Sequence, residues 1–205
     1  MSKVDFKKEH KKLYAPPKKF VLVEVPEMQF LMVDGHGDPN VAQEYKDAIE
    51  ALYAVAYKLK FASKKQLDRD YVVPPLEGLW WAEDMDSFTT ARDKSQWDWT
   101  MMIMTPDWIS ENLYFQTLAM LRDSKPLTSL EKVRLETYHE GLSVQIMHIG
   151  SYDDETPTLH ALHHEFLPQH ALVEDGKHHE IYLSDPRRVP PEKLKTILRQ
   201  PVRRK

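Results

Sequence analysis

The sequence predicts an α+β fold in which duplicated βαββ units form one curved antiparallel sheet, with helices on one face and a ligand cleft on the other. Three observations carry this prediction. Short runs rich in β-branched and aromatic residues end at turns rich in Pro, Gly and Asp, as strands do. A long amphipathic stripe indicates a helix between such runs. The order of strand, Gly-containing turn, helix and two further strands then recurs in the second half of the chain.

The first unit begins with two strands, residues 20–25 and 29–34, which Pro26 separates. The polar turn at residues 35–39 leads into a helix that we expect Asn40 to cap, with Gln43 completing a capping box. Residues 78–83 and 96–104 follow as strands. The expected buried stripe of the helix consists of Val41, Tyr45, Ala48, Ile49, Leu52, Ala56 and Leu59.

The second unit repeats this order after a connecting helix at about residues 110–122. Residues 133–139 fit a strand or a helix, 144–150 a strand, 157–166 a helix, and 179–183 and 195–202 two strands. We therefore expect a single domain over residues 1–205, with pseudo-repeats at about 20–105 and 140–202. The cleft is expected at the junction of the two repeats.

Composition excludes several classes of function. The chain has 205 residues, no cysteine and a formal net charge of −4. Disulfides and thiolate metal sites are therefore excluded, and the acidic balance argues against a nucleic-acid partner. No apolar run approaches the roughly 18 residues of a membrane span, and the first residues lack the apolar core of a signal peptide. We expect a cytoplasmic protein without a membrane partner, and the oligomeric state stays open.

The histidines do not form a recognisable metal motif. His160 and His164 have the i, i+4 spacing of zinc-binding helices, but Ala161 stands where the glutamate of such a motif would be. No Gly-rich phosphate loop and no G-x-S-x-G elbow occurs. We therefore expect neither a metal nor an organic cofactor.

Aromatic residues are unusually frequent on the predicted strands. Strand alternation places Trp97, Trp99 and Met101 on one face. Indole rings offer a stacking surface for a flat ligand, and methionine adapts to varied shapes. The alternative is that these side chains are ordinary core residues. The tryptophans on predicted strands are Trp80, Trp81, Trp97 and Trp99.

Glu180 lies inside the strand-like run HEIYL, on the same face as His178 and Tyr182. A carboxylate held among aromatic rings can bind a cation or act as a general base towards water. Alternation alone does not single out Glu180, because Glu24 and Asp98 have similar contexts and an outward-facing, solvated glutamate fits the pattern equally well.

Three segments closely resemble the stand-alone GyrI-like small-molecule-binding family: residues 25–40 (VPEMQFLMVDGHGDPN), 75–81 (PLEGLWW) and 179–188 (HEIYLSDPRR). The similarity extends over nearly the whole chain. It implies a duplicated βαββ fold with a ligand cleft between the halves. In relatives a strand glutamate contacts the ligand, which is often cationic, and Glu180 stands at the matching position.

The resemblance also implies a function. It implies binding of planar, cationic or reactive drug-like molecules, and some stand-alone members hydrolyse cyclopropane-bearing, DNA-alkylating compounds. By this likeness Glu180 is the general base and Tyr182 or Tyr138 orients the water. The alternative is a non-catalytic effector or protein-interaction module. The expected ligand-binding residues are Trp80, Trp97, Trp99, Met101, Tyr138 and Glu180.

Overall fold

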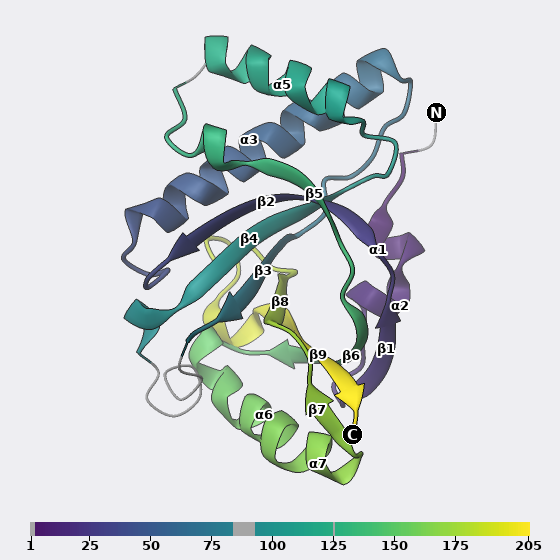
Figure 1. Cartoon of the computed structure of the whole chain (residues 1–205), viewed down its shortest axis with the longest axis vertical. Coiled ribbons are helices and arrows are strands. Elements are labelled where there is room, and N and C mark those ends of the chain that lie inside the picture. Colours follow the sequence, from purple (N-terminus) through teal and green to yellow (C-terminus); the bar gives the residue numbers. More distant parts are fainter. Residues whose placement is uncertain (1–2, 84–92, 125) are drawn as a thin grey trace.

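The computed structural model describes residues 3–83, 93–124 and 126–205 (Figure 1). The strands are β1 (Val21–Val25), β2 (Met28–His36), β3 (Leu76–Trp81), β4 (Asp98–Thr105), β5 (Arg134–Tyr138), β6 (Gly141–Ile149), β7 (Leu172–Glu174), β8 (His178–Tyr182) and β9 (Lys195–Arg204). The helices are α1 (Phe6–Glu9), α2 (Lys11–Tyr14), α3 (Gln43–Gln66), α5 (Glu111–Ser124), α6 (Thr156–Ala161) and α7 (Leu167–Gln169), with a π-helical turn (Leu162–Phe166) between the last two. Short 3₁₀ turns occur at Lys94–Gln96, Leu130–Lys132, Tyr152–Glu155 and Pro191–Lys193.

The sheet is antiparallel throughout and its strand order is symmetric. The order is β1-β6-β9-β8-β3-β4-β2-β5, and β7 pairs with β9 outside this path. Exchanging β1, β2, β3 and β4 with β5, β6, β8 and β9, respectively, gives the same order read from the other end. The two halves meet where β3 pairs with β8, and β1 and β5 each pair with a strand of the other half. The predicted α+β fold, with one antiparallel sheet built from duplicated units, is confirmed.

Helix α3 packs against β2 and β4 through the buried stripe that the sequence predicts over most of its length. Alanines on this stripe let the helix backbone approach the sheet closely. Leu52, Val55 and Leu59 are fully buried beside them. In Figure 1, α3 and α5 lie at one end of the molecule and α6 and α7 at the other.

The start of α3 differs from the prediction. The helix begins at Gln43, and Val41, expected on its buried stripe, is 75% exposed before the helix starts. Asn40 does not cap it, because the Asn40 amide donates to the Asp38 carboxylate at 2.8 Å instead. The Asp38 carbonyl also accepts the backbone N–H groups of Val41 and Ala42, so a turn occupies the place of the expected cap.

Three other elements differ from the prediction or resolve an ambiguity in it. Residues 96 and 97 precede the strand, because the Asp93 carboxylate accepts the N–H of Ser95 and closes a 3₁₀ turn there. The ambiguous segment at 133–139 is a strand, β5. The helix predicted at 157–166 continues through the π-helical turn into α7.

Both helical layers lie on the same face of the sheet. Tyr45 of α3 packs its ring 5.2 Å from that of Trp99, on β4. In the other half, Leu162 and Leu167 cluster with Val144 of β6. Strand register carries Val144 and Trp99 to one face, which we call the helix-bearing face. No helix in the described parts of the chain has the length and apolar character needed to cross a membrane.

Gly35 allows the tightest contact in this packing. It lies opposite Trp99 in the β2–β4 pair, and a Cβ added to it would sit 2.1 Å from the indole ring. Gly35→Ala should therefore lower the free energy of unfolding by about 3 kcal/mol, as overpacking does. The matched variant Gly37→Ala meets no atom within 4 Å and carries only the strain of its φ of +95°, which costs about 1 kcal/mol. Urea denaturation of both variants measures the difference, and equal losses would contradict the tight contact.

Candidate functional site

Glu180 is held at the centre of the sheet by a chain of hydrogen bonds on the helix-bearing face. Trp80 Nε1 donates to the Tyr182 hydroxyl at 2.9 Å, and this hydroxyl donates to Glu180 Oε2 at 2.7 Å. His178 Nε2 lies 3.5 Å from Glu180 Oε1. The Glu180 side chain is 13% exposed, so the carboxylate is held by hydrogen bonds and still reaches solvent.

Gly78 makes room for this arrangement. It pairs with Glu180 across the β3–β8 junction and with Met101 across the β3–β4 pair. A Cβ at Gly78 would lie 2.8 Å from Trp80 Nε1 and 3.1 Å from Met101 Sδ. The missing side chain thus lets Trp80 and Met101 pack beside the carboxylate.

Aromatic rings from both halves surround the carboxylate. Tyr45 of α3 lies 6.1 Å from Trp80, between ring centroids. Tyr152, from the 3₁₀ turn that precedes α6, lies 5.8 Å from Tyr182. Tyr45 follows β2 and Tyr152 follows β6, so the two tyrosines come from equivalent parts of the repeat. The site is therefore built at the junction of the halves.

The tyrosines of the site stay protonated at neutral pH. Burial and then the charge of Glu180 raise the pKa of Tyr182 well above its usual value. The same two causes raise the pKa of Tyr152 to about 12. These hydroxyls are therefore hydrogen-bond donors towards the carboxylate or a ligand. Within the described residues, no Lys or Arg nitrogen lies within 4.0 Å of the Glu180 carboxylate.

The structure brings most of the predicted residues together, but not all of them. Trp99 and Met101 are fully buried on the neighbouring strand β4, on the same face as Trp80, while the Trp97 ring lies 5.8 Å from that of Trp80. Tyr138 lies on the opposite face, where its ring packs against Phe30. The cleft was expected on that opposite face, whereas Glu180, Tyr182 and Trp80 share the face of α3.

Sequence reasoning missed the helical contribution to the site. The sequence predicts Tyr45 only as part of the buried stripe and assigns no role to Tyr152. Glu155, 4% exposed at the end of the same turn, also acts electrostatically on Tyr182. Their position in the repeat could have identified them, because each tyrosine follows the Gly-containing turn of its half. In the described part of the chain no three His, Cys, Asp or Glu residues gather in a way that could hold a metal ion.

A buried ionic chain lies directly behind Glu180, on the opposite face. His179 Nε2 is 2.9 Å from Glu77 Oε2, and His179 Nδ1 is 3.0 Å from Glu140 Oε1. Arg199 Nη1 donates to Glu140 Oε2 at 3.1 Å, and Tyr14 donates to Glu77 Oε1 at 3.0 Å. The side chains of the four ionic residues are at most 2% exposed. Two carboxylates and two cations balance one another there.

The two carboxylates keep His179 charged. Burial opposes the charge of the imidazolium, but Glu140 and Glu77 outweigh it and raise the pKa of His179 to about 9. Burial likewise opposes the charge of Glu140, but His179 and Arg199 outweigh it and lower its pKa to about 2. His179 therefore donates one N–H to each neighbouring carboxylate.

The ionic chain also ties the N-terminal helices to the sheet. Arg199 Nη2 donates to the Leu13 carbonyl at 2.8 Å, and Gln145 Nε2 donates to the Lys12 carbonyl at 2.6 Å. Leu13 packs with Ile181 of β8 in the same apolar cluster. Helix α2 thus closes the opposite face behind Glu180.

Comparison with known proteins agrees with the fold. The GyrI-like small molecule binding domain model matches residues 18–203. This chain belongs to the GyrI-like family. No protein with a curated description matches it.

Solved structures from Listeria innocua are similar to this GyrI-like chain over its whole length. An uncharacterized conserved protein is 45% identical, with a TM-score of 0.90, and the match covers 98% of this chain and 100% of that one. Two structures described as hydrolases are 44% and 43% identical, with TM-scores of 0.88 and 0.86 and the same coverage.

The ionic chain should make the protein less stable at alkaline pH. Because the pKa of His179 is raised in the folded state, its contribution is fully present below about 6.5 and is lost as the pH rises through about 9. We expect the free energy of unfolding to fall by up to ~3 kcal/mol between pH 7 and pH 10. Urea denaturation across this range measures the slope.

The variant His179→Gln is the control for this slope. It should be less stable than the parent chain at pH 7 by about 3 kcal/mol, because it breaks a buried ionic contact. Its stability should change less between pH 7 and pH 10, since the titrating imidazole is gone. The same alkaline slope in both proteins would show that His179 is not its source.

Proposed function

We propose that this protein binds planar, cationic or reactive drug-like molecules at the Glu180–Tyr182–Trp80 cluster and hydrolyses those that carry a strained cyclopropane. One observation carries the proposal: a carboxylate, 13% exposed, is held by hydrogen bonds among aromatic rings from both halves of the domain. The family to which the chain belongs binds small molecules.

The charges and rings suit a cationic, flat ligand. The rings of Trp80, which is 4% exposed, and Tyr45 lie near the carboxylate, and a flat cation that inserts there would stack on them and make cation–π contacts. Glu180 supplies the negative charge, and no Lys or Arg of the described residues neutralises it. A carboxylate in a partly dry site attracts a cation more strongly than one in bulk water.

Hydrolysis uses the same groups. Glu180 accepts a proton from water, the water oxygen bonds to a methylene of the cyclopropane, and the carbon–carbon bond of the ring breaks. Its electron pair moves into the conjugated carbonyl of the substrate, which takes up a proton and becomes a phenol, while protonated Glu180 releases the proton that it received and returns to the carboxylate. Tyr182, hydrogen-bonded to Glu180, keeps the carboxylate oriented. The relatives described as hydrolases, at 43% and 44% identity, support hydrolysis as the reaction class.

The decisive variant is Glu180→Gln, which keeps the shape of the side chain and removes its basicity. With a cyclopropane-bearing alkylator, we expect ring opening to slow by a factor of about 100 to 10,000. Mass spectrometry follows the addition of water. The control Glu192→Gln changes an exposed glutamate in a 3₁₀ turn and should leave the rate unchanged.

Binding without turnover is a distinguishable outcome. If the parent chain quenches tryptophan fluorescence with a planar cation but opens no cyclopropane, the hydrolytic half of the proposal fails and binding stands. If Glu180→Gln binds the cation and opens the ring as well as the parent chain does, Glu180 is needed for neither binding nor hydrolysis, and the proposal is wrong about this residue.

Tyr182→Phe tests the hydrogen-bond chain itself. The change removes the donor to Glu180 and leaves the Trp80 N–H without its acceptor. We expect a loss of about 1–3 kcal/mol in stability, the cost of an unsatisfied buried donor. Turnover should fall at least several-fold, with kcat affected more than KM, because the carboxylate loses its orientation. Thermal unfolding and steady-state kinetics measure the two effects, and unchanged kcat would remove Tyr182 from the mechanism.

A further inference from the structure

A cavity of about 420 Å³ lies over β2, β3 and β4, on the face of the sheet opposite to that of Glu180. Trp80 and Trp81 are neighbours on β3 and point to opposite faces, so Trp81 lines this cavity while Trp80 lines the candidate site. Further lining residues are Asp34, Asp98, Thr100, Arg134 and Lys177. The volume is within the range of small-molecule sites, roughly 300–1,000 Å³.

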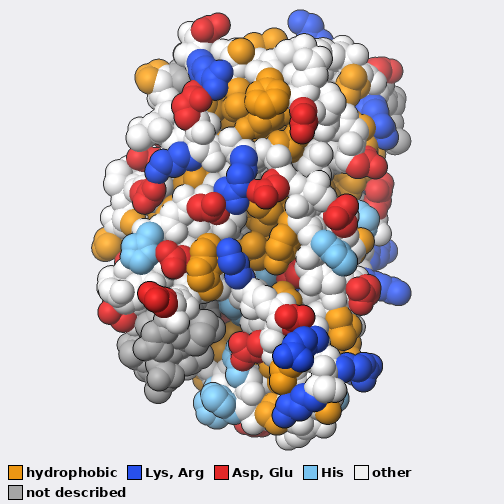
Figure 2. Space-filling view, in the orientation of Figure 1, with side chains coloured by type: hydrophobic (Ala, Val, Ile, Leu, Met, Phe, Trp, Pro, Cys, Tyr) orange, Lys and Arg blue, Asp and Glu red, His pale blue; other side chains and the backbone are white. Residues whose placement is uncertain are grey.

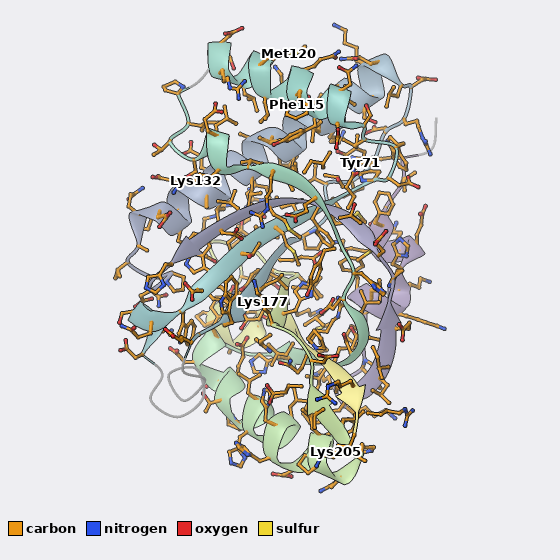
Figure 3. The ribbon with its side chains drawn as sticks, viewed as in Figure 1. Tyr71, Phe115, Met120, Lys132, Lys177 and Lys205 are labelled. Atoms are coloured by element: carbon orange, nitrogen blue, oxygen red, sulfur yellow. The ribbon has the colours of Figure 1, made fainter. Side chains whose placement is uncertain are left out.

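Charged groups of both signs meet at this cavity. Figure 3 labels Lys177 near the middle of the molecule, beside β3 and β4. In the same view, Figure 2 shows acidic and basic side chains next to one another, with hydrophobic side chains exposed between them. The face therefore offers apolar and ionic contacts to the same ligand.

The carboxylates at the cavity are already paired. Asp34 accepts a hydrogen bond from Thr100 Oγ1 at 2.6 Å, and its two oxygens lie 3.0 Å from the two terminal nitrogens of Arg134. Asp98 lies 2.8 Å from His36 Nδ1. Glu44, at the rim, pairs with Lys132 at 2.6 Å. A cationic ligand would have to displace one of these partners.

Lys177, unlike the other charged residues described at the cavity, has no ionic partner among the described residues. Its ammonium lies 3.3 Å from the centroid of the Trp81 ring, and among the described residues no carboxylate is within 4.0 Å of it. Burial lowers the pKa of Lys177 and the charge of Arg134 adds to this, although the charges of Asp34 and Asp98 oppose it. A cation–π contact at a partly exposed site is worth about 0.5–1 kcal/mol, less than the roughly 1.5–3 kcal/mol of a hydrogen bond to a charged group.

We propose that this cavity is a second binding site, for small planar aromatic carboxylates. The ligand carboxylate pairs with Lys177, which leaves the Trp81 ring, and the ligand ring takes its place against the indole. Arg134 also lies at this cavity, where Asp34 and Glu136 balance its charge. The two faces of the central strands then select opposite charges, with Glu180 on one face and Lys177 on the other.

Three probes of similar size separate charge from shape: 1-naphthoate, 1-naphthylmethanol and 1-naphthylmethylammonium. Isothermal titration calorimetry with the parent chain should show naphthoate binding at least ~10-fold more tightly than the alcohol. The ammonium compound is titrated into Glu180→Gln, which lacks the carboxylate of the proposed cation site, and should bind there no more tightly than the alcohol. In Lys177→Met the advantage of naphthoate over the alcohol should disappear. The control Lys193→Met, at an exposed lysine, should retain it.

Two further variants locate the binding. Glu180→Gln should leave naphthoate affinity unchanged, because Glu180 lies on the other face, whereas Trp81→Leu should weaken it. Thermal unfolding of each variant confirms that it is folded. The proposal is overturned if naphthoate binds no better than the alcohol, if Lys177→Met keeps the preference, or if Glu180→Gln abolishes it. Loss of cation binding in Glu180→Gln with naphthoate binding intact would separate this site from the proposed function.

Discussion

The buried ionic chain Glu77–His179–Glu140–Arg199 is the interaction on which the rest of the structure depends. Four charged side chains, each at most 2% exposed, are stable there only because their charges balance and their contacts are short. The chain joins β3 of the first half to β8 and β9 of the second, and through Arg199 it holds α2. Breaking one contact would leave a charge buried without its partner, so the halves are fixed at their junction.

Because side chains alternate along β8, the ionic chain on one face fixes the position of Glu180 on the other face. His179 points to the ionic chain, and the next residue, Glu180, points to the helix-bearing face. Its position is therefore set by a rigid backbone and by the hydrogen bond from Tyr182. The same alternation separates Trp80 from Trp81, so that one sheet carries a carboxylate among aromatic rings on one side and a lysine over an aromatic ring on the other.

The sequence predicted elements whose signal is local and missed features that depend on pairing. The amphipathic stripe of α3, the strand-like runs and the recurring element order all follow from periodicity, and the structure contains them. The helix start was misassigned because the Asp38 carboxylate captures the Asn40 side chain, a competition between two polar groups that spacing does not reveal. Glu180 could be chosen only through family resemblance, since a single strand pattern does not distinguish it from Glu24. The partners Glu77 and Glu140 lie 102 and 39 positions from His179, and no local pattern connects them.

The central claim is that the carboxylate of Glu180 receives the ligand between the two halves. A crystal structure of the chain with a planar aromatic cation such as ethidium tests it most directly. We predict that the ligand's charged nitrogen lies within about 4–6 Å of the Glu180 carboxylate, with its rings against Trp80 and Tyr45. A ligand bound on the opposite face, or away from the β3–β8 junction, would contradict this account.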